Sequence, residues 1–169
     1  MTTRRYPIGI QTFSEIIRGG YVYVDKTDLV WRLTQTKYVF LSRPRRFGKS
    51  LLATTLESYF RGERELFEGL KIMQLEKVWE KYPVIHLDLS KAKGKDSALE
   101  LQRHLNLLLA DVGYGDNPLE KTPGEKLNGL IRRAYEKTGR QVAVIIDEYD
   151  APLLDVLHDD ALLEDLNPE

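Results

Sequence analysis

The sequence predicts an α/β fold built on a mainly parallel sheet. Three short apolar runs, rich in aromatic and β-branched residues, have the length of buried strands: residues 38–41, 84–89 and 141–146. Segments with helical spacing of leucines separate these runs, and the clearest is 97–112. Alternation of strands with helices is typical of a parallel sheet covered by helices.

Composition excludes several classes of protein. The 169 residues, 42% hydrophobic and 30% charged, suit an ordinary globular domain. The net charge of −1 does not favour a nucleic-acid or membrane surface. The chain has no cysteine, which excludes disulfides and thiol catalysis. We expect a cytoplasmic protein, because no apolar run is long enough for a transmembrane helix or a signal peptide.

The first 36 residues form the predicted lead-in. A short helix is expected over 12–18, with Thr12 and Glu15 at capping-box spacing and a glycine pair at its end. Residues 21–24 have the pattern of a short strand. Asp25 then has the position of the N-cap of a helix that reaches about Thr36.

Further elements follow the central apolar run 38–41. Helical segments are expected over 51–60, 63–67, 75–81 and 125–137, the second stopped by Gly69 and the last by Gly139. Residues 113–124 contain three glycines and two prolines and are therefore expected to form a loop.

The central motif lies where the first apolar run ends. Gly48, Lys49 and Ser50 stand between a predicted strand and a predicted helix, the context of a phosphate-binding P-loop. Backbone N–H groups at a helix start attract phosphate, the lysine reaches the β- and γ-phosphate oxygens, and the serine hydroxyl ligates Mg²⁺. Arg43 stands where the usual pattern has a glycine. The predicted nucleotide-binding residues are Arg43, Pro44, Arg45, Arg46, Phe47, Gly48, Lys49, Ser50 and Leu51.

A second motif ends the third apolar run. Asp147 and Glu148 directly follow residues 142–146, the pattern of a Walker B strand. Asp147 is predicted to hold Mg²⁺ together with Ser50. Glu148 is predicted to polarise the attacking water, with Lys49 and Arg46 stabilising charge on the phosphates. Either motif alone occurs by chance, but both in this order favour binding of a nucleoside triphosphate.

Other residues keep two interpretations. Asp25 and Lys26 face the nucleotide or a partner domain, or else form a helix start. Asp88 points into the site from a strand end, or ends the strand in a turn. The arginine-rich loop is also compatible with nucleic-acid binding, which we rank last because the neutral chain offers no wider basic surface. Asp150 has no predicted role.

Six blocks of the sequence together resemble the bacterial AAA-ATPase-like domain family: residues 7–13, 21–30, 40–52, 59–72, 82–90 and 144–153. The resemblance implies a P-loop NTPase fold of the ASCE type, a three-layer sandwich, with ATP and Mg²⁺ bound at Gly48, Lys49, Ser50, Asp147 and Glu148. It also implies that Arg43 is a family trait. Members of that family usually carry a nuclease-like domain of the PD-(D/E)XK type further along the chain.

The predicted domain spans residues 1–169, with the core from the phosphate loop to the acidic strand end over 37–150 and a tail over 151–169. Since ASCE folds insert a further strand after Walker B, we expect the sheet to be incomplete at its C-terminal side and its open edges to favour self-association. The first functional hypothesis is an ATPase that acts in the intact protein. The second is a nucleotide-sensing module with little turnover that regulates a C-terminal nuclease-like domain.

Overall fold

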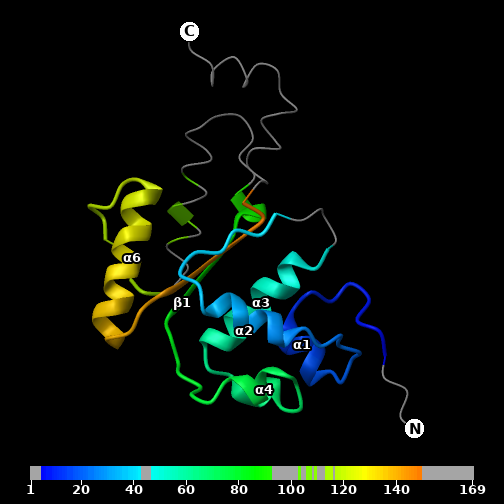
Figure 1. Cartoon of the computed structure of the whole chain (residues 1–169). Coiled ribbons are helices and arrows are strands. Elements are labelled where there is room, and N and C mark those ends of the chain that lie inside the picture. The colour runs from blue at the N-terminus through cyan, green and yellow to red at the C-terminus, as the bar shows by residue number, and fades with distance from the viewer. Residues whose placement is uncertain are drawn as a thin grey trace. The chain divides into compact units, whose positions relative to one another are not determined.

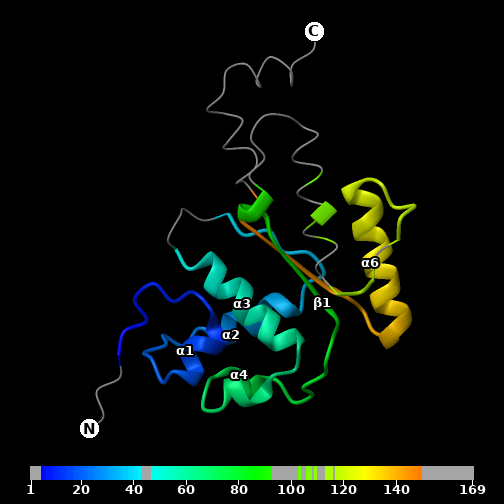
Figure 2. The same ribbon diagram turned by 180° about the vertical axis from the view of Figure 1, so that it is seen from behind.

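A computed structural model describes residues 5–42, 47–92, 103, 106–107, 109, 113–115 and 117–149. The chain divides into two compact units, Met1–Tyr82 and Pro83–Glu169, and each is described by itself. The first unit contains helices α1 (Phe13–Arg18), α2 (Thr27–Thr34), α3 (Lys49–Phe60) and α4 (Ile72–Leu75), and the 3-10 helix η1 (Arg64–Phe67) (Figure 1). The second contains strands β1 (Val84–Asp88) and β2 (Ala143–Asp147), the 3-10 helix η2 (Leu89–Ala92) and helix α6 (Pro123–Thr138), which Figure 2 presents from behind.

Aromatic side chains build the core of the first unit. Phe13 and Phe67 are fully buried, with ring centroids 4.8 Å apart. Trp79 packs on Phe67 at 5.1 Å and on Tyr59 at 5.7 Å. Burial of such large side chains is the main source of stability in a unit this small, because each removes a large apolar area from water.

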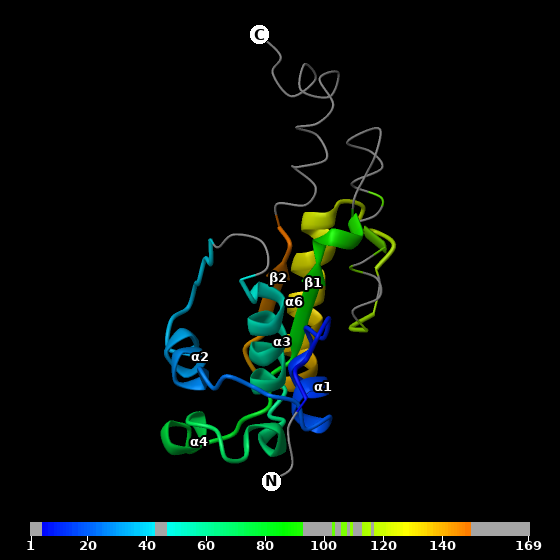
Figure 3. The same ribbon diagram turned by 90° about the vertical axis from the view of Figure 1, so that its right-hand side faces the viewer.

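Helix α1 forms where the sequence predicts it, but it is capped differently. The Thr12 side chain makes no capping hydrogen bond, so the predicted capping box is wrong. Instead the Phe13 N–H donates to Thr54 Oγ1 of α3 at 3.1 Å. The same hydroxyl lies 3.2 Å from the carbonyl oxygen of Gln11. Helices α1 and α3 therefore lie side by side, joined by one threonine (Figure 3).

Helix α2 begins one residue later than predicted, so its N-cap is Lys26 and not Asp25, and it ends at Thr34. The Asp25 carboxylate still accepts the first N–H of the helix. Asp25 Oδ1 accepts from the N–H and the hydroxyl of Thr27 at 2.9 and 2.7 Å. Asp25 Oδ2 accepts from the Lys71 N–H at 2.8 Å. The buried Thr27 hydroxyl accepts from the Ile72 N–H at 3.0 Å, so this pair of residues satisfies the starts of both α2 and α4.

Three predicted elements of the first unit are wrong. Residues 21–24 and 38–41 are not in strands, and Tyr38 and Phe40 are 84% and 74% exposed. β-branched and aromatic composition indicates only that a segment suits a sheet, whereas a strand also needs a neighbour to complete its hydrogen bonds. Residues 76–81 are not helical. Trp79 packs against the aromatic core, and Glu76 Oε1 accepts from the Val78 N–H at 2.8 Å.

The second unit has a two-stranded parallel sheet among the described residues, which confirms the strands predicted over 84–89 and 141–146. The register pairs Val84 with Ala143 and ends with Asp88 beside Asp147. Ile85 and Leu87 pack with Leu130 of α6 in one apolar cluster. A strand, a helix and a parallel strand in sequence order agree with an α/β fold. The three-layer arrangement stays a prediction.

Helix α6 has a complete capping box at its start. The Thr122 hydroxyl accepts from the Glu125 N–H at 3.2 Å, and the Glu125 carboxylate accepts from the Thr122 N–H at 3.0 Å. Pro123 occupies the first helical turn, where a missing N–H costs nothing. Gly139 ends the helix in a left-handed conformation, as predicted.

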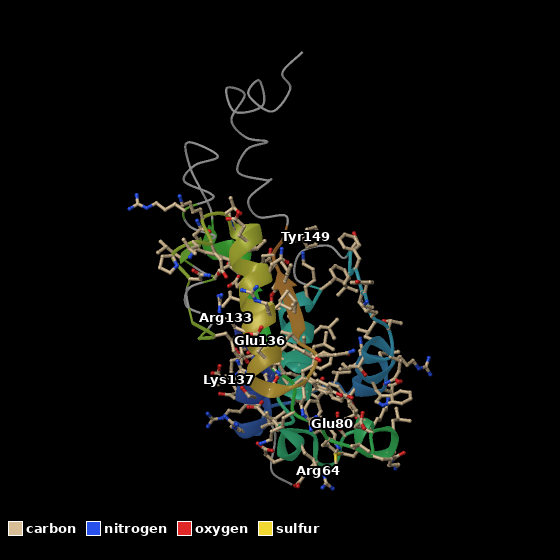
Figure 4. The ribbon with its side chains drawn as sticks, turned by 90° about the vertical axis from the view of Figure 1, so that its left-hand side faces the viewer. Arg64, Glu80, Arg133, Glu136, Lys137 and Tyr149 are labelled. Atoms are coloured by element: carbon tan, nitrogen blue, oxygen red, sulfur yellow. The ribbon has the colours of Figure 1, made fainter. Side chains whose placement is uncertain are left out.

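Arg133 of α6 fastens the preceding loop to the helix (Figure 4). Its guanidinium forms two bonds to the Glu120 carboxylate, at 2.6 and 3.1 Å, and also donates to the carbonyls of Tyr114 and Gly115. The hydrogen bonds to Arg133 lower the pKa of Glu120. The carboxylate lies directly over Gly129, where a Cβ atom would collide with it.

Two predicted segments fall mainly outside the described residues. Of the predicted helix 97–112, residues 103, 106–107 and 109 are described and helical. The predicted tail, 151–169, is not described, nor is Asp150. Within the described part of the chain, no helix combines the length and apolarity needed to cross a membrane.

Candidate phosphate-binding loop and acidic strand end

The start of helix α3 carries the predicted phosphate-binding residues. Gly48 immediately precedes the helix, and Lys49 is its first residue. Lys49, Ser50 and Leu51 are half-buried, and Phe47 is 63% exposed. The other four predicted loop residues, Arg43, Pro44, Arg45 and Arg46, lie outside the described residues.

Gly48 has a backbone conformation that favours glycine. Its φ and ψ angles are 74° and 27°, in the left-handed region. Among the described residues, no atom lies within 4 Å of where a Cβ atom would stand at this position. The backbone angle is therefore the feature that calls for glycine here.

The first turn of α3 has features that suit an anion. It contains no acidic residue. Among the described residues, no side chain accepts a hydrogen bond from the N–H groups of Lys49, Ser50 or Leu51. The helix dipole and free N–H groups together attract negative charge, and the Lys49 ammonium adds a full positive charge.

The acidic strand end lies in the second unit. Asp147 is the last residue of β2 and is 9% exposed. Glu148 follows with a φ of 51°, a left-handed value that is uncommon outside glycine. The Glu148 N–H donates to Asp147 Oδ1 at 3.0 Å. Such backbone angles persist where surrounding structure fixes them, often at functional sites, and here they occur at a bend directly after the strand.

The register of the sheet adds Asp88 to this end. Asp88 and Asp147 are direct partners at the carboxyl ends of two parallel strands. Open α/β sheets bind their ligands at this edge. Asp88 Oδ1 also accepts from the Ser90 N–H at 3.0 Å, so both interpretations of this residue from the sequence have support. The strand register, which the sequence does not state, is the signal that links the two aspartates.

The predicted Mg²⁺ ligands have suitable chemistry. Ser50 and Asp147 offer hydroxyl and carboxylate oxygens, which are the hard donors that Mg²⁺ prefers. Across the residues that the structure describes, no three acidic or histidine side chains gather into a ready-made metal site. Mg²⁺ bound to a nucleotide needs only one or two protein ligands, because the phosphates supply others. The joint site of Ser50 and Asp147 remains a prediction, since each residue belongs to a different unit.

Asp25 and Lys26 have a structural explanation. The capping hydrogen bonds described above engage both carboxylate oxygens of Asp25, and Lys26 is exposed. Burial alone would raise the pKa of Asp25, but hydrogen bonds from Thr27 and Lys71 outweigh it and lower that pKa. The structure therefore favours the helix-start interpretation of this pair.

Comparison with known proteins identifies the family. A protein of Azotobacter chroococcum mcd 1, described as an uncharacterized protein in the vnfD 5' region, is 38% identical over 161 residues, which cover 93% of this chain and 31% of the relative. The chain thus spans about a third of the relative's length. No solved structure matches. The sequence profile of the AAA-ATPase-like family, described as predicted AAA-ATPase, matches residues 7–168, and the chain therefore belongs to that family.

Proposed function

We propose that this chain is a P-loop domain that binds ATP with Mg²⁺ and hydrolyses ATP in the intact protein. The observation that carries the proposal is the start of α3, where a left-handed Gly48 precedes Lys49 and the first turn contains no acid. Family membership supports the same conclusion, because the family is described as predicted AAA-ATPase.

Each residue has a defined part in the proposed reaction. Lys49 and the N–H groups of residues 48–51 hold the phosphates, with Arg43, Arg45 and Arg46 adding positive charge. Ser50 and Asp147 would hold Mg²⁺, which would supply positive charge to the bound phosphates. Glu148 accepts a proton from the attacking water as the oxygen bonds to the γ-phosphorus and the bond to ADP breaks.

The sheet supports the proposed fold. In the P-loop NTPase fold of ASCE type, which we propose here, the strand before Walker B pairs with it in parallel. The parallel ladder of β1 and β2 fits that arrangement. The paired ends of the two strands bring Asp88 next to Asp147, so Asp88 would add a second carboxylate beside the residue that would hold Mg²⁺.

A second candidate is a nucleotide-sensing module with little turnover. The observation that favours it is the length of the relative, of which this chain matches only 31%. A module of this kind would bind ATP and switch its contacts with a C-terminal, nuclease-like domain, while catalysis by Glu148 would be weak or absent.

Calorimetry tests nucleotide binding. ATP should bind this chain in the presence of Mg²⁺, and Lys49→Ala should lower the affinity at least about tenfold, because a charge-assisted contact to phosphate is lost. Lys77→Ala is the matched control, since Lys77 is an exposed lysine of the same unit. Unchanged ATP affinity in Lys49→Ala would exclude the P-loop interpretation.

Hydrolysis separates the two candidates. If Glu148 is the general base, Glu148→Gln should lower turnover at least about a hundredfold while ATP still binds. Glu136→Gln, on an exposed position of α6, should leave turnover unchanged. Release of phosphate is measured on this chain and on one extended past Glu169. Binding without turnover in both would favour the sensing module.

A further inference from the structure

A small cavity lies on the first unit, away from the start of α3. Its volume is about 150 Å³, and it is lined by Ile17, Gly20, Tyr21, Tyr23, Glu68 and Leu70. A cavity of this size holds one benzene-sized group. The lining residues include two tyrosines, two aliphatic residues and one acidic residue, and none of them carries a positive charge.

The end of helix α1 positions the two tyrosines. Gly20 has a φ of 65°, and the Tyr21 N–H returns to the Ile16 carbonyl at 3.1 Å, which turns the chain sharply. The Tyr21 ring lies against Gly19, where a Cβ atom would collide with it. Tyr21 and Tyr23 both line the cavity, whereas Val22 between them does not.

Tyr23 lines the cavity and is held by aromatic packing on its other contacts. The ring packs edge-on against Phe13 with centroids 5.3 Å apart. Burial raises the pKa of the Tyr23 phenol, and the Thr55 side chain of α3 lies beside that phenol. The Thr55 hydroxyl itself donates to the Leu51 carbonyl oxygen at 2.7 Å. Phe13 and Thr55 therefore flank the tyrosine at this wall of the cavity.

A tight turn fixes Glu68 at the cavity. The Leu70 N–H donates to the Phe67 carbonyl at 2.9 Å, Glu68 has φ −56° and ψ 128°, and Gly69 has φ 79°. These values define a type II turn with glycine at its third position. Glu68 is exposed, and within the described ranges no cation forms an ion pair with it.

We propose that this cavity binds the guanidinium group of an arginine side chain from a partner protein. A planar guanidinium stacks on aromatic rings and donates to a carboxylate, and Tyr21, Tyr23 and Glu68 supply both kinds of contact. Ile17 and Leu70 offer aliphatic surface for the methylene stem of the arginine. The cavity is too small for a nucleotide, and its carboxylate repels anions.

Nuclear magnetic resonance tests the proposal with three blocked tripeptides, Gly-Arg-Gly, Gly-Lys-Gly and Gly-citrulline-Gly. Citrulline has the shape of arginine without its charge. The arginine peptide should shift the amide resonances of residues 20–23 and 68–70 saturably, and the citrulline peptide should not. Equal binding of the citrulline or the lysine peptide would overturn the assignment to a guanidinium, and no saturable shift with arginine would overturn the site.

Variants locate the contact. Glu68→Gln should weaken binding of the arginine peptide about fivefold, and Tyr21→Leu should weaken it by a similar factor. Glu65→Gln is the control, because Glu65 is exposed, lies three residues away and does not line the cavity. The spectrum of each variant reports its folding directly. Unchanged affinity in folded Glu68→Gln would contradict the proposal.

Discussion

Helices α6 and α3 begin in opposite ways. The chain itself satisfies the start of α6, through the reciprocal bonds of Thr122 and Glu125 and through Pro123. Hydrogen bonds to the N–H groups of Thr122 and Lys121 lower the pKa of Glu125, so a negative charge stays at the positive end of that helix. The start of α3 has a glycine in place of a capping side chain and no acid in its first turn.

The starts of α6 and α3 are both helix N-termini, but only the start of α3 is available to a ligand. A capped helix start is stable by itself and has nothing left to offer a ligand. An uncapped start leaves N–H groups that water satisfies until an anion replaces it. Helices α1 and α2 follow the first pattern, with caps from Thr54 and Asp25. Among the helices in the described part of the chain, α3 is therefore the one whose start is suited to bind phosphate.

The largest expected effect on ATP affinity follows from substitution of Gly48. Gly48→Ala and Gly139→Ala both place a Cβ atom in a left-handed backbone with open space around it, so each should lose about 1 kcal/mol of stability. Only Gly48→Ala should also lower ATP affinity, by at least about tenfold, because the N–H groups of the loop are redirected. Thermal unfolding and calorimetry measure the two quantities. Equal ATP affinity in both variants would remove the distinction between the two helices.

The next effect concerns the cap of α6. Thr122→Ala should lower the free energy of unfolding by about 1 kcal/mol, because the Glu125 N–H loses its partner, and should leave ATP affinity unchanged. Urea denaturation gives the stability. Thr36→Ala serves as control, since the Thr36 hydroxyl donates only to the Leu33 carbonyl at an exposed helix end. A change in ATP affinity in Thr122→Ala would show that the capped start is not purely structural.

The smallest effect is the pH dependence that Asp25 contributes to the start of α2. Since its pKa is lowered on folding, its charge stabilises the folded chain above the ordinary carboxyl pKa, and this stabilisation disappears as pH falls through the lowered value. Asp25→Asn keeps a capping oxygen but loses the charge, so it should lose about 0.5 kcal/mol at pH 7, a value limited by solvent screening.

The pH profile of that variant provides its own control. Urea denaturation at pH 7 and at pH 3 should give a difference between Asp25→Asn and the original chain that shrinks as the carboxylate becomes protonated. A difference that is the same at both pH values would mean that the charge of Asp25 has no part in holding α2.

Local patterns in the sequence were sufficient to predict several elements of the fold. Helix α6 has its cap, its apolar stripe and its final glycine within one segment, and β1 and β2 are apolar runs of strand length. The segments at 21–24 and 38–41 have equal β-propensity but do not pair, because pairing depends on a neighbour elsewhere in the chain. Trp79 fixes its segment through Phe67 and Tyr59, which are close in space and distant in sequence.

The candidate site, like the fold, could be predicted only in part from the sequence. Gly48 and Lys49 at a helix start follow from the order of residues alone, and the structure agrees with that part of the prediction. The pairing of Asp88 with Asp147 follows from strand register, and the left-handed angle of Glu148 follows from the turn after β2. The role of Asp88 stayed open from the sequence, because strand register depends on how two distant segments align. The residue order around Glu148 contained no signal for its left-handed angle.

The single hydroxyl of Thr54 has a consequence for how the first unit opens. It holds the Phe13 N–H of α1 from the second turn of α3, across 41 positions of sequence. Any local unfolding that lifts α3 must also release that amide to solvent, so the two helices belong to one cooperative unit. Hydrogen exchange of the Phe13 amide therefore reports on the local stability of α3. A ligand that stabilises the start of α3 should slow this exchange although it does not contact Phe13.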